Sequence, residues 1–193
     1  VLPVIQSLRE ELADQCLISI DTTRAPVARA ALDAGASIIN DISAGLDDLE
    51  MLPLAASRAC PIILMHMQGT PATMQDNPTY EDVVADVAGH LKQRLADAKA
   101  AGIAEHRILL DPGIGFGKKV EHNLSLLRNL STFAALGRPL VLGTSRKGFL
   151  AKIAGESESR ERLFSTAASV AWCVANRAAI VRVHEFEPIV KIV

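Results

Sequence analysis

Polar and ionisable residues follow six short apolar runs of this chain, each at the point where the run ends. The six sets are Asp21, the pair Asn40 and Asp41, the pair His66 and Gln68, Asp111, the run Ser145-Arg146-Lys147, and the pair Arg182 and His184. Carboxylates and an amide suit the hydrogen-bonding edge of a polar ring, whereas cations and imidazoles suit an anion. In a parallel sheet covered by helices, all strand C-termini emerge on one side, so we expect these side chains to share one binding site.

Stretches with helical spacing separate the apolar runs, which indicates repeated β-then-α units. The predicted strands cover residues 17–20, 37–40, 61–66, 107–111, 139–143 and 179–183. The predicted helices cover residues 1–13, 25–34, 46–58, 121–135, 147–154 and 160–176, and a capping-box-like Thr79–Asp82 opens another that runs to about 101. Residues 67–78 carry two prolines and form a loop long enough to cover a site. Residues 187–193 have the pattern of a helix that is just beginning.

Six β/α units fit either an open doubly wound sheet or part of a barrel. Open sheets concentrate ligands at one switch point, so chemistry at every strand end favours the barrel. A complete barrel needs about 250 residues, and this chain has 193. The predicted fold class is therefore α/β, a (β/α)8 TIM-type barrel that is incomplete, with about six β/α units and the first two missing. We expect residues 1–193 to form a single domain, truncated at the N-terminus and at the C-terminus.

The composition is that of a soluble α/β protein, with 49% hydrophobic and 22% charged residues and a net charge of −2. No basic run is present, which argues against nucleic-acid binding. No apolar stretch reaches membrane-spanning length and no signal sequence opens the chain, so we expect no membrane contact. Three cysteines without a CxxC pair indicate reduced thiols and a cytoplasmic location. Cys16 and Cys60 each precede a predicted strand, and we expect both to be buried.

The segment Asp111–Lys118 is the densest motif, with glycines at positions 113, 115 and 117. It fits neither the dinucleotide-binding GxGxxG pattern nor a Walker loop. A flexible turn between strand and helix is the simpler explanation. However, Asp111 and Phe116 in one turn favour a functional role, with the carboxylate binding a polar heterocycle and the aromatic ring packing against a ligand.

Simpler roles compete with binding at several of the other strand ends. Asp21 and Asp41 are each able to cap a following helix; binding is favoured for Asp21 and for Asn40, and the two roles are balanced for Asp41. His66 has no second metal ligand at a suitable spacing, so we interpret it as structural, with Met65 as an apolar wall.

Two cation-rich segments point to an anion. In Ser145-Arg146-Lys147 the two cations stand at the start of a predicted helix, where they oppose the helix dipole, so we expect them to serve a ligand. Arg182 and His184 alternate along a strand end, which puts both side chains on one face as a pyrophosphate clamp. The preceding run, Ala178–Val181, is predicted to be buried.

Six motifs taken in order resemble dihydropteroate synthase, the folate-pathway enzyme that sulfonamides block. They are Asp21-Thr22-Thr23, Ile39–Ile42, Leu64–Gly69, Asp111–Lys118, Ser145-Arg146-Lys147 and Arg182-Val183-His184. The resemblance covers essentially the whole chain. It implies a homodimeric (β/α)8 barrel that requires Mg²⁺ and condenses 6-hydroxymethyl-7,8-dihydropterin diphosphate with p-aminobenzoate, giving 7,8-dihydropteroate and pyrophosphate.

The resemblance also implies a role for each site residue. The pterin would be bound by Asp21, Asn40, Met65, Asp111, Gly143 and Lys147. The p-aminobenzoate would lie beside Phe116, Ser145 and Lys147, and the diphosphate would contact Asn40, Arg182 and His184. The catalytic residues would be Asp111, Lys147, Arg182 and His184. No metal ligand is expected in this chain, because the family's metal-binding Asn belongs to the missing N-terminal part.

Two departures and two rival functions accompany this resemblance. Glu185 stands where the family usually has Asp, and Ser165-Thr166 stands where Gly-Thr is expected. One rival is a pterin-binding methyltransferase domain, which has no use for the cations of Ser145-Arg146-Lys147 and Arg182-Val183-His184. The other is a catalytically incomplete pterin-binding fragment, which would bind dihydropterin but release no pyrophosphate.

Overall fold

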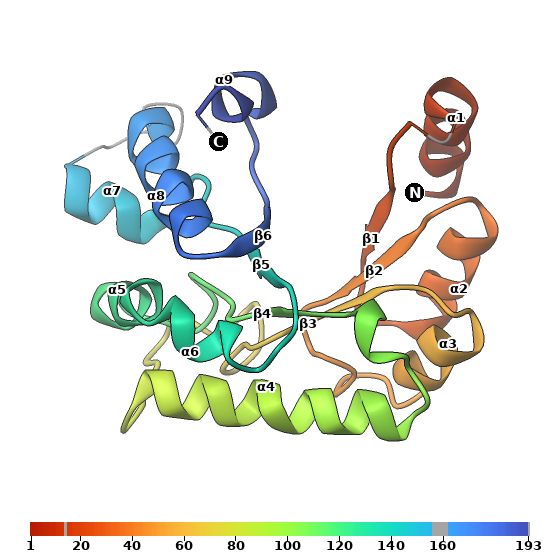
Figure 1. The fold of residues 1–193 in the computed structure, drawn as a ribbon, viewed down its shortest axis with the longest axis horizontal. Helices are drawn as coiled ribbons and strands as arrows, with labels where there is room; N and C mark the ends of the chain where they lie inside the picture. The colour runs from red at the N-terminus through yellow and green to blue at the C-terminus, as the bar shows by residue number, and fades with distance from the viewer. Residues whose placement is uncertain (14, 156–161, 193) are drawn as a thin grey trace. The chain divides into compact units, whose positions relative to one another are not determined.

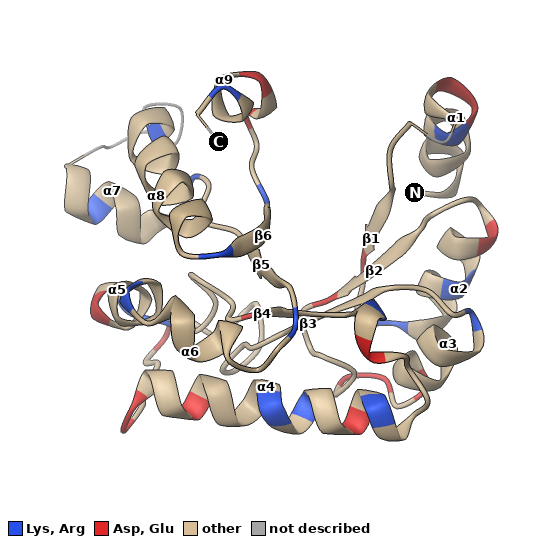
Figure 2. Ribbon diagram, viewed as in Figure 1, with Lys and Arg blue, Asp and Glu red and all other residues tan. Residues whose placement is uncertain are grey.

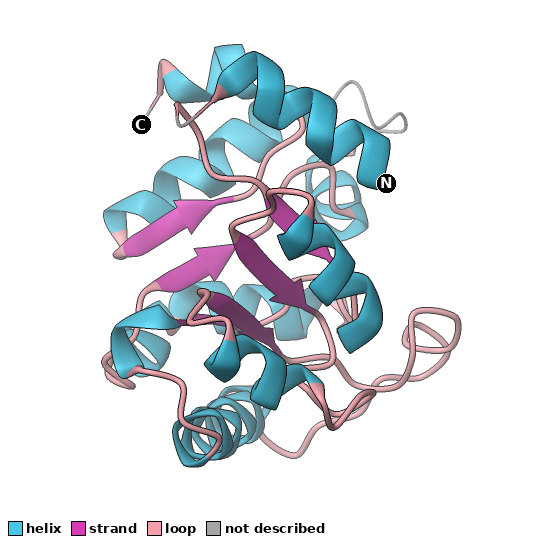
Figure 3. Ribbon diagram, turned by 90° about the vertical axis from the view of Figure 1, so that its right-hand side faces the viewer, coloured by secondary structure: helices cyan, strands magenta, loops and turns pink. Residues whose placement is uncertain are grey.

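The computed structural model describes residues 1–13, 15–155 and 162–192. The chain divides into two compact units, and each is described by itself. Unit 1 comprises Val1–Met65 and Leu91–Leu109, and unit 2 comprises His66–His90 and Leu110–Val193. The described chain is built of helices and strands joined by loops (Figure 3).

Unit 1 contains three parallel strands in sequence order, with helices between them (Figure 1). The strands are β1 (Ser19–Asp21), β2 (Ile38–Asp41) and β3 (Ile62–Met65), and the helices are α1 (Leu2–Leu12), α2 (Ala25–Asp33) and α3 (Met51–Ser57). Residues of β3 are buried throughout, as expected of a parallel strand covered on both faces. Asp21 lies directly opposite Asn40 in the register of β1 and β2.

Two elements contain residues of both units: α4 (Val83–Ala100) and β4 (Ile108–Asp111), the second preceded by the short 3₁₀ helix η1 (Glu105–Arg107). Basic and acidic side chains are interspersed along α4 (Figure 2). Gly102 ends this helix as predicted, with a left-handed φ of 91° and its N–H donating to the carbonyl of Lys99.

Unit 2 continues with parallel strands, each followed by helical segments. The strands after β4 are β5 (Leu140–Leu142) and β6 (Ala178–Val181). The helices are α5 (Val120–Arg128), α6 (Leu130–Ala134), α7 (Gly148–Ala154), α8 (Leu163–Ala175) and α9 (Phe186–Val190). Leu110 of β4 and both end residues of β5, Leu140 and Leu142, are buried.

All six predicted strands are present among the described residues, but two helix predictions need correction. The helix predicted over 46–58 begins only at Met51, because Asp48 folds the preceding loop back: one carboxylate oxygen accepts from the N–H of Ala25 and caps α2, and the other accepts from the N–H of Glu50. The helix predicted over 121–135 is interrupted at Asn129, which separates α5 from α6. Positions 160 and 161 of the helix predicted over 160–176 lie outside the described residues.

The predicted capping box at Thr79–Asp82 is wrong. Helix α4 begins at Val83, and the Asp82 carboxylate accepts from the N–H groups of Val84 (2.9 Å) and Ala85 (3.1 Å), so Asp82 itself is the cap. Thr79 is engaged elsewhere, because its N–H and carbonyl are both bonded to the side-chain amide of Gln68. These two hydrogen bonds between Gln68 and Thr79 join the two ends of the predicted loop over 67–78.

Two burial predictions also fail. Cys60 is buried as predicted, but Cys16 is exposed, because β1 begins only at Ser19 and Cys16 lies in the bend before it. The run Ala178–Val181 is only partly covered, with Ile180 41% exposed, since β6 has β5 as its one strand neighbour in the sheet order. Over the part of the chain that is described, we find no helix with the length and apolar character that a membrane span requires.

Candidate active site

Asp21 and Asn40 form the polar end of β1 and β2 in unit 1. The parallel register places them side by side, and the Asn40 amide donates to the Asp21 carboxylate at 3.0 Å. Asn40 is 7% exposed, whereas Asp21 faces solvent. The first N–H of α2, that of Ala25, donates to Asp48. The pair therefore offers one carboxylate and one amide to a polar ligand.

Asp41, next to this pair, has a structural role. It is fully buried, and its two oxygens accept from the N–H and hydroxyl of Ser43 and from the N–H of Gly45. Desolvation raises the pKa of Asp41, and the bonds from Ser43 and Gly45 oppose that shift. The sequence left helix capping and binding balanced at Asp41. In the structure both oxygens hold the loop after β2, which is a structural role, but the groups that they accept from belong to a loop and not to a helix.

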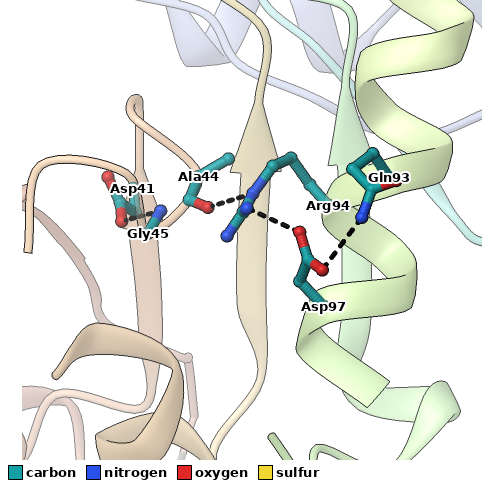
Figure 4. Close-up of polar contacts among 6 residues, drawn as sticks. All are labelled: Asp41, Ala44, Gly45, Gln93, Arg94 and Asp97. Atoms are coloured by element: carbon teal, nitrogen blue, oxygen red, sulfur yellow. Dashed lines mark hydrogen bonds and ion pairs between the residues drawn. The ribbon is translucent and has the colours of Figure 1, made fainter. Parts of the chain in front are cut away.

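The same loop is fastened from α4. The Arg94 guanidinium donates to the carbonyl of Ala44 at 2.8 Å and to the Asp97 carboxylate at 2.7 Å (Figure 4). Gln93 donates to the other Asp97 oxygen at 3.0 Å. Ala44 has a left-handed φ of 55°, a conformation that costs energy for a residue other than glycine and that these contacts hold in place.

In unit 2 Asp111 ends β4 and opens the glycine-rich loop. One carboxylate oxygen accepts from the N–H of Gly113 at 2.7 Å. Desolvation raises the pKa of Asp111 to about 6, although the Gly113 bond and the charges of Lys118, Lys147 and Arg182 act in the opposite direction. A carboxylate that three cations favour in its ionised form is suited to bind a cationic or hydrogen-bond-donating ring.

Lys147 lies across the glycine-rich loop. Its Nζ is 4.1 Å from the centre of the Phe116 ring, a cation–π contact. Its aliphatic stem crosses Gly115, where a Cβ would come within 2.8 Å of the Lys147 Cδ and where φ is +82°. Glycine at position 115 therefore lets the lysine stem cross the loop. Desolvation lowers the pKa of Lys147, Asp111 raises it and Arg182 lowers it.

Ser145 and His184 meet beside this cluster. The His184 Nδ1 is 2.9 Å from the Ser145 hydroxyl, which also accepts from the His184 N–H at 3.2 Å. Desolvation, followed by the charges of Arg146, Arg182 and Lys147, lowers the pKa of His184.

The predicted strand-end alternation of Arg182 and His184 needs correction, since β6 ends at Val181 and both residues lie beyond it. The Arg182 N–H still donates to the carbonyl of Leu142 at 2.9 Å, which holds the segment beside the end of β5. Gly143 lies here too, and a Cβ built on it would be 3.8 Å from the Arg182 Cβ.

The sequence predicts that Arg146 and Lys147 both serve a ligand. In the structure Arg146 instead makes contacts within the protein. Its guanidinium pairs with Glu185, the residue that stands where the family usually has Asp. Its N–H donates to the hydroxyl of the buried Thr166, and its carbonyl accepts from Arg162. These contacts hold the turn between Ser145 and Lys147, so Arg146 organises the motif, whereas Lys147 lines the cavity beside the glycine-rich loop.

Lys118 is the site residue that sequence reasoning missed. It is only 3% exposed, and its Nζ donates to the carbonyl of Phe116 at 2.8 Å and lies 3.0 Å from the His66 Nδ1. Desolvation lowers the pKa of Lys118 to about 7; Asp111 raises it and Lys147 lowers it. The one available signal was its position at the end of the glycine run. His66 is buried, and desolvation, with smaller effects of Lys118 and His90, lowers its pKa to about 3, consistent with the structural role predicted for it.

A cavity of about 640 Å³ opens next to the glycine-rich loop in unit 2. Three segments line it: the loop that contains Gln75–Pro78, the start of α5, and the turn into α7 with Lys147. Gly115 and Lys118 contribute from the glycine-rich loop. The volume is sufficient for a small aromatic molecule, and the lining includes several lysines.

The predicted site residues are thus brought together within each unit. Asp21 and Asn40 meet in unit 1, where Met65 ends β3 as a buried apolar residue. The residues gathered in unit 2 are Asp111, Phe116, Gly143, Ser145, Lys147, Arg182 and His184. The sharing of one cavity by both sets stays a prediction, as does a single domain over residues 1–193.

The side chains at hand do not suit a Mg²⁺ ion, which prefers several hard oxygen ligands. Among residues 1–13, 15–155 and 162–192, no group of three or more His, Cys, Asp or Glu side chains is arranged to hold a metal. The residues predicted to contact the diphosphate are a guanidinium, an imidazole and an amide.

Comparison with known proteins identifies the family. Residues 1–184 match the pterin binding enzyme family. Dihydropteroate synthase from Synechocystis sp. is 44% identical over 191 residues, which cover 99% of this chain and 65% of that protein. The crystal structure of dihydropteroate synthase from Stenotrophomonas maltophilia, with active site-bound imidazole, has a TM-score of 0.95 at 44% identity and is matched over 100% of this chain and 71% of that chain. Dihydropteroate synthase from Xanthomonas albilineans in complex with 7,8-dihydropteroate has a TM-score of 0.91 at 37% identity, covering 100% and 69%.

These matches confirm the resemblance and the predicted fold class, a (β/α)8-type barrel of which this chain holds six β/α units. The chain spans about two-thirds of the length of these relatives. The family match extends over residues 1–184 and includes both sets of site residues. This chain therefore belongs to the pterin binding enzyme family.

Proposed function

We propose that the protein is a dihydropteroate synthase, a transferase of folate biosynthesis that joins 6-hydroxymethyl-7,8-dihydropterin diphosphate to p-aminobenzoate. The observation that carries this proposal is the arrangement in unit 2. There a desolvated carboxylate, Asp111, lies within the electrostatic reach of Lys147 and Arg182, and Lys147 lies over the ring of Phe116. The product bound to the Xanthomonas albilineans relative, 7,8-dihydropteroate, supports the same reaction.

The pterin is the ligand that suits the carboxylates. One edge of a pterin ring carries an amino group and ring N–H donors, and Asp111 and Asp21 are acceptors for such donors. Asn40, which donates to Asp21, fixes the orientation of that carboxylate. Met65 and Gly143 would contribute the apolar wall and the space for the flat ring.

The arylamine is the ligand that suits the loop next to it. Phe116 offers an aromatic surface, and Lys147 and Ser145 offer a cation and a hydroxyl for the carboxylate of p-aminobenzoate. Sulfonamides resemble p-aminobenzoate in shape and charge distribution, so we also propose them as competitive inhibitors at this position.

The reaction breaks the bond between the pterin methylene carbon and the diphosphate oxygen and forms a bond from that carbon to the arylamine nitrogen, which then loses a proton. Asp111 would stabilise the positive charge that develops on the pterin as the diphosphate departs. Arg182 and His184 would bind the departing anion, with Asn40 beside it. The chain then contributes orientation and charge stabilisation without a covalent nucleophile.

A Mg²⁺ requirement, a cytoplasmic location and homodimer formation are proposals that follow from family membership alone.

Pyrophosphate release tests the proposal directly. In the protein expressed from its complete gene, Lys147→Ala and Arg182→Ala are each expected to slow pyrophosphate release by about 100-fold or more. Arg182→Ala removes a charge that stabilises the departing diphosphate, and Lys147→Ala removes the cation that binds and orients the arylamine. Lys92→Ala, which removes an exposed lysine of α4, serves as the matched surface control. Near-wild-type rates in both site variants would contradict the proposal. So would methyl transfer from methyltetrahydrofolate to a corrinoid acceptor, the activity of the rival methyltransferase class.

A further inference from the structure

Side chains bind three successive carbonyl groups of the glycine-rich loop. The carbonyl of Gly115 accepts from the Gln75 amide at 2.7 Å, and that of Phe116 accepts from the Lys118 ammonium at 2.8 Å. The carbonyl of Gly117 accepts from the Tyr80 hydroxyl at 2.7 Å. We call the three donors, Gln75, Tyr80 and Lys118, the carbonyl clamp. Such dense side-chain bonding fixes the path of a loop whose glycines would otherwise leave it free.

Lys118 is the buried member of the carbonyl clamp. Besides Phe116, its Nζ contacts the ring nitrogen of His66 at 3.0 Å and the His66 carbonyl at 3.4 Å. Because His66 directly follows β3, these bonds tie the glycine-rich loop to the segment that leaves that strand. A lysine that is 3% exposed loses hydration, and the fixed bonds replace the water that it gives up.

The carbonyl clamp acts on the second half of the loop. The first half is held separately by the bond from the Gly113 N–H to the Asp111 carboxylate. The clamped residues include Phe116, whose ring lies under the Lys147 ammonium, and Gly115, over which the Lys147 stem passes. At Gly117 the backbone approaches so closely that a Cβ would lie 2.4 Å from the carbonyl of Gln68. The arrangement of Phe116 and Lys147 therefore depends on the clamp, and that of Asp111 does not.

We propose that Lys118 and Tyr80 are positioning residues that hold Phe116 under Lys147 and so set the affinity for the arylamine substrate, without contacting either substrate. This inference rests on the proposed function, because it assigns the arylamine to Phe116 and Lys147. It predicts a selective effect: loss of a clamp donor weakens arylamine binding more than it weakens binding of the pterin diphosphate.

Two variants test this selectivity in the protein expressed from its complete gene, with KM measured for each substrate by pyrophosphate release. Tyr80→Phe removes a single O–H and keeps the ring, and we expect KM for p-aminobenzoate to rise about threefold. Lys118→Met keeps the length of the stem and removes the donors, and the expected rise is about tenfold or more, since a charge-assisted bond is lost. In Tyr80→Phe, KM for the pterin diphosphate is expected to stay within about twofold of wild type, the factor that corresponds to a few tenths of a kcal/mol. Lys118→Met also removes a charge that favours the ionised form of Asp111, so its KM for the pterin diphosphate is expected to rise, but by less than its KM for p-aminobenzoate.

Lys92→Met is the matched control, because it makes the same substitution at an exposed position of α4 and should leave both KM values unchanged. An unchanged KM for p-aminobenzoate, or an equal rise in both KM values, would overturn the inference and leave the proposed function intact. If Lys118→Met does not fold, Tyr80→Phe decides the matter alone. A wild-type protein that releases no pyrophosphate would overturn the proposed function, and this inference with it.

Discussion

Two opposing effects act on the pKa of the Asp111 carboxyl group. Desolvation raises its pKa to about 6, while the Gly113 N–H and three cations favour the ionised form. A pterin that donates hydrogen bonds needs the ionised carboxylate. We therefore expect pterin affinity to fall as the pH drops through about 6. At pH 5 about one Asp111 carboxylate in ten remains ionised, so the Kd for the pterin should be about tenfold higher than at pH 7.5. Titration calorimetry across this pH range measures the effect.

Asp111→Asn provides the control for that pH dependence. The amide does not titrate, so its pterin affinity should be weak and flat from pH 5 to pH 7.5. Because the folded pKa lies above the unfolded value, the ionised carboxylate costs stability, and that cost grows as the pH rises through about 6. Asp111→Asn should accordingly be more stable than wild type at pH 7.5, and this difference should vanish below about pH 4. A sloping affinity in the variant would assign the titration to another group.

At the scale of elements, the loop between β2 and α3 is held from two sides, by Asp41 from within and by Arg94 from α4 (Figure 4). Asp41→Ala would leave the N–H of Ser43, its hydroxyl and the N–H of Gly45 without their buried acceptor. We expect a loss of about 3 kcal/mol in the free energy of unfolding, measured by urea denaturation with circular dichroism. Asp47→Ala, at an exposed position of the same loop, should cost less than about 0.5 kcal/mol. If Asp41→Ala also lowered the free energy of unfolding by less than about 0.5 kcal/mol, Asp41 would not be holding this loop.

Arg94→Met tests the other side of the same loop. The variant keeps most of the apolar stem and removes the donor to the Ala44 carbonyl, so we expect a loss of about 2 kcal/mol. Because Asp41 and Arg94 hold one loop, their combined loss should depart from the sum of the single losses by more than about 0.5 kcal/mol. Strict additivity in the double variant would show that the two contacts stabilise the loop independently.

At the scale of the whole molecule, the chain spans about two-thirds of the length of its relatives, 65% in the Synechocystis sp. protein. The remaining third of those proteins has no counterpart among these 193 residues. We therefore expect residues 1–193 alone to bind dihydropterin but to release pyrophosphate at least about 100-fold more slowly than the product of the complete gene, a factor typical of losing one group that stabilises the transition state. A coupled pyrophosphate assay on both proteins makes the comparison. Equal rates would mean that this chain carries the whole reaction.

The sequence by itself determined the element order and the family. Apolar runs that end in polar residues predicted all six strands of the described chain, because burial on both faces of a parallel strand requires a continuous apolar run. The residues at those strand ends carried the resemblance that the comparisons confirm. These signals are local, since they depend on neighbours along the chain.

The tertiary structure alone decided what depends on contacts between distant residues. Asp48 caps a helix that begins 23 residues earlier, and Arg94 reaches a carbonyl 50 residues away. Lys118 is buried against His66, which lies 52 residues earlier in the chain, and its place in the carbonyl clamp depends on this contact. No spacing along the chain encodes such partners, because desolvation and hydrogen bonding act through space, and they assign a role to a side chain only when folding has brought its neighbours to it.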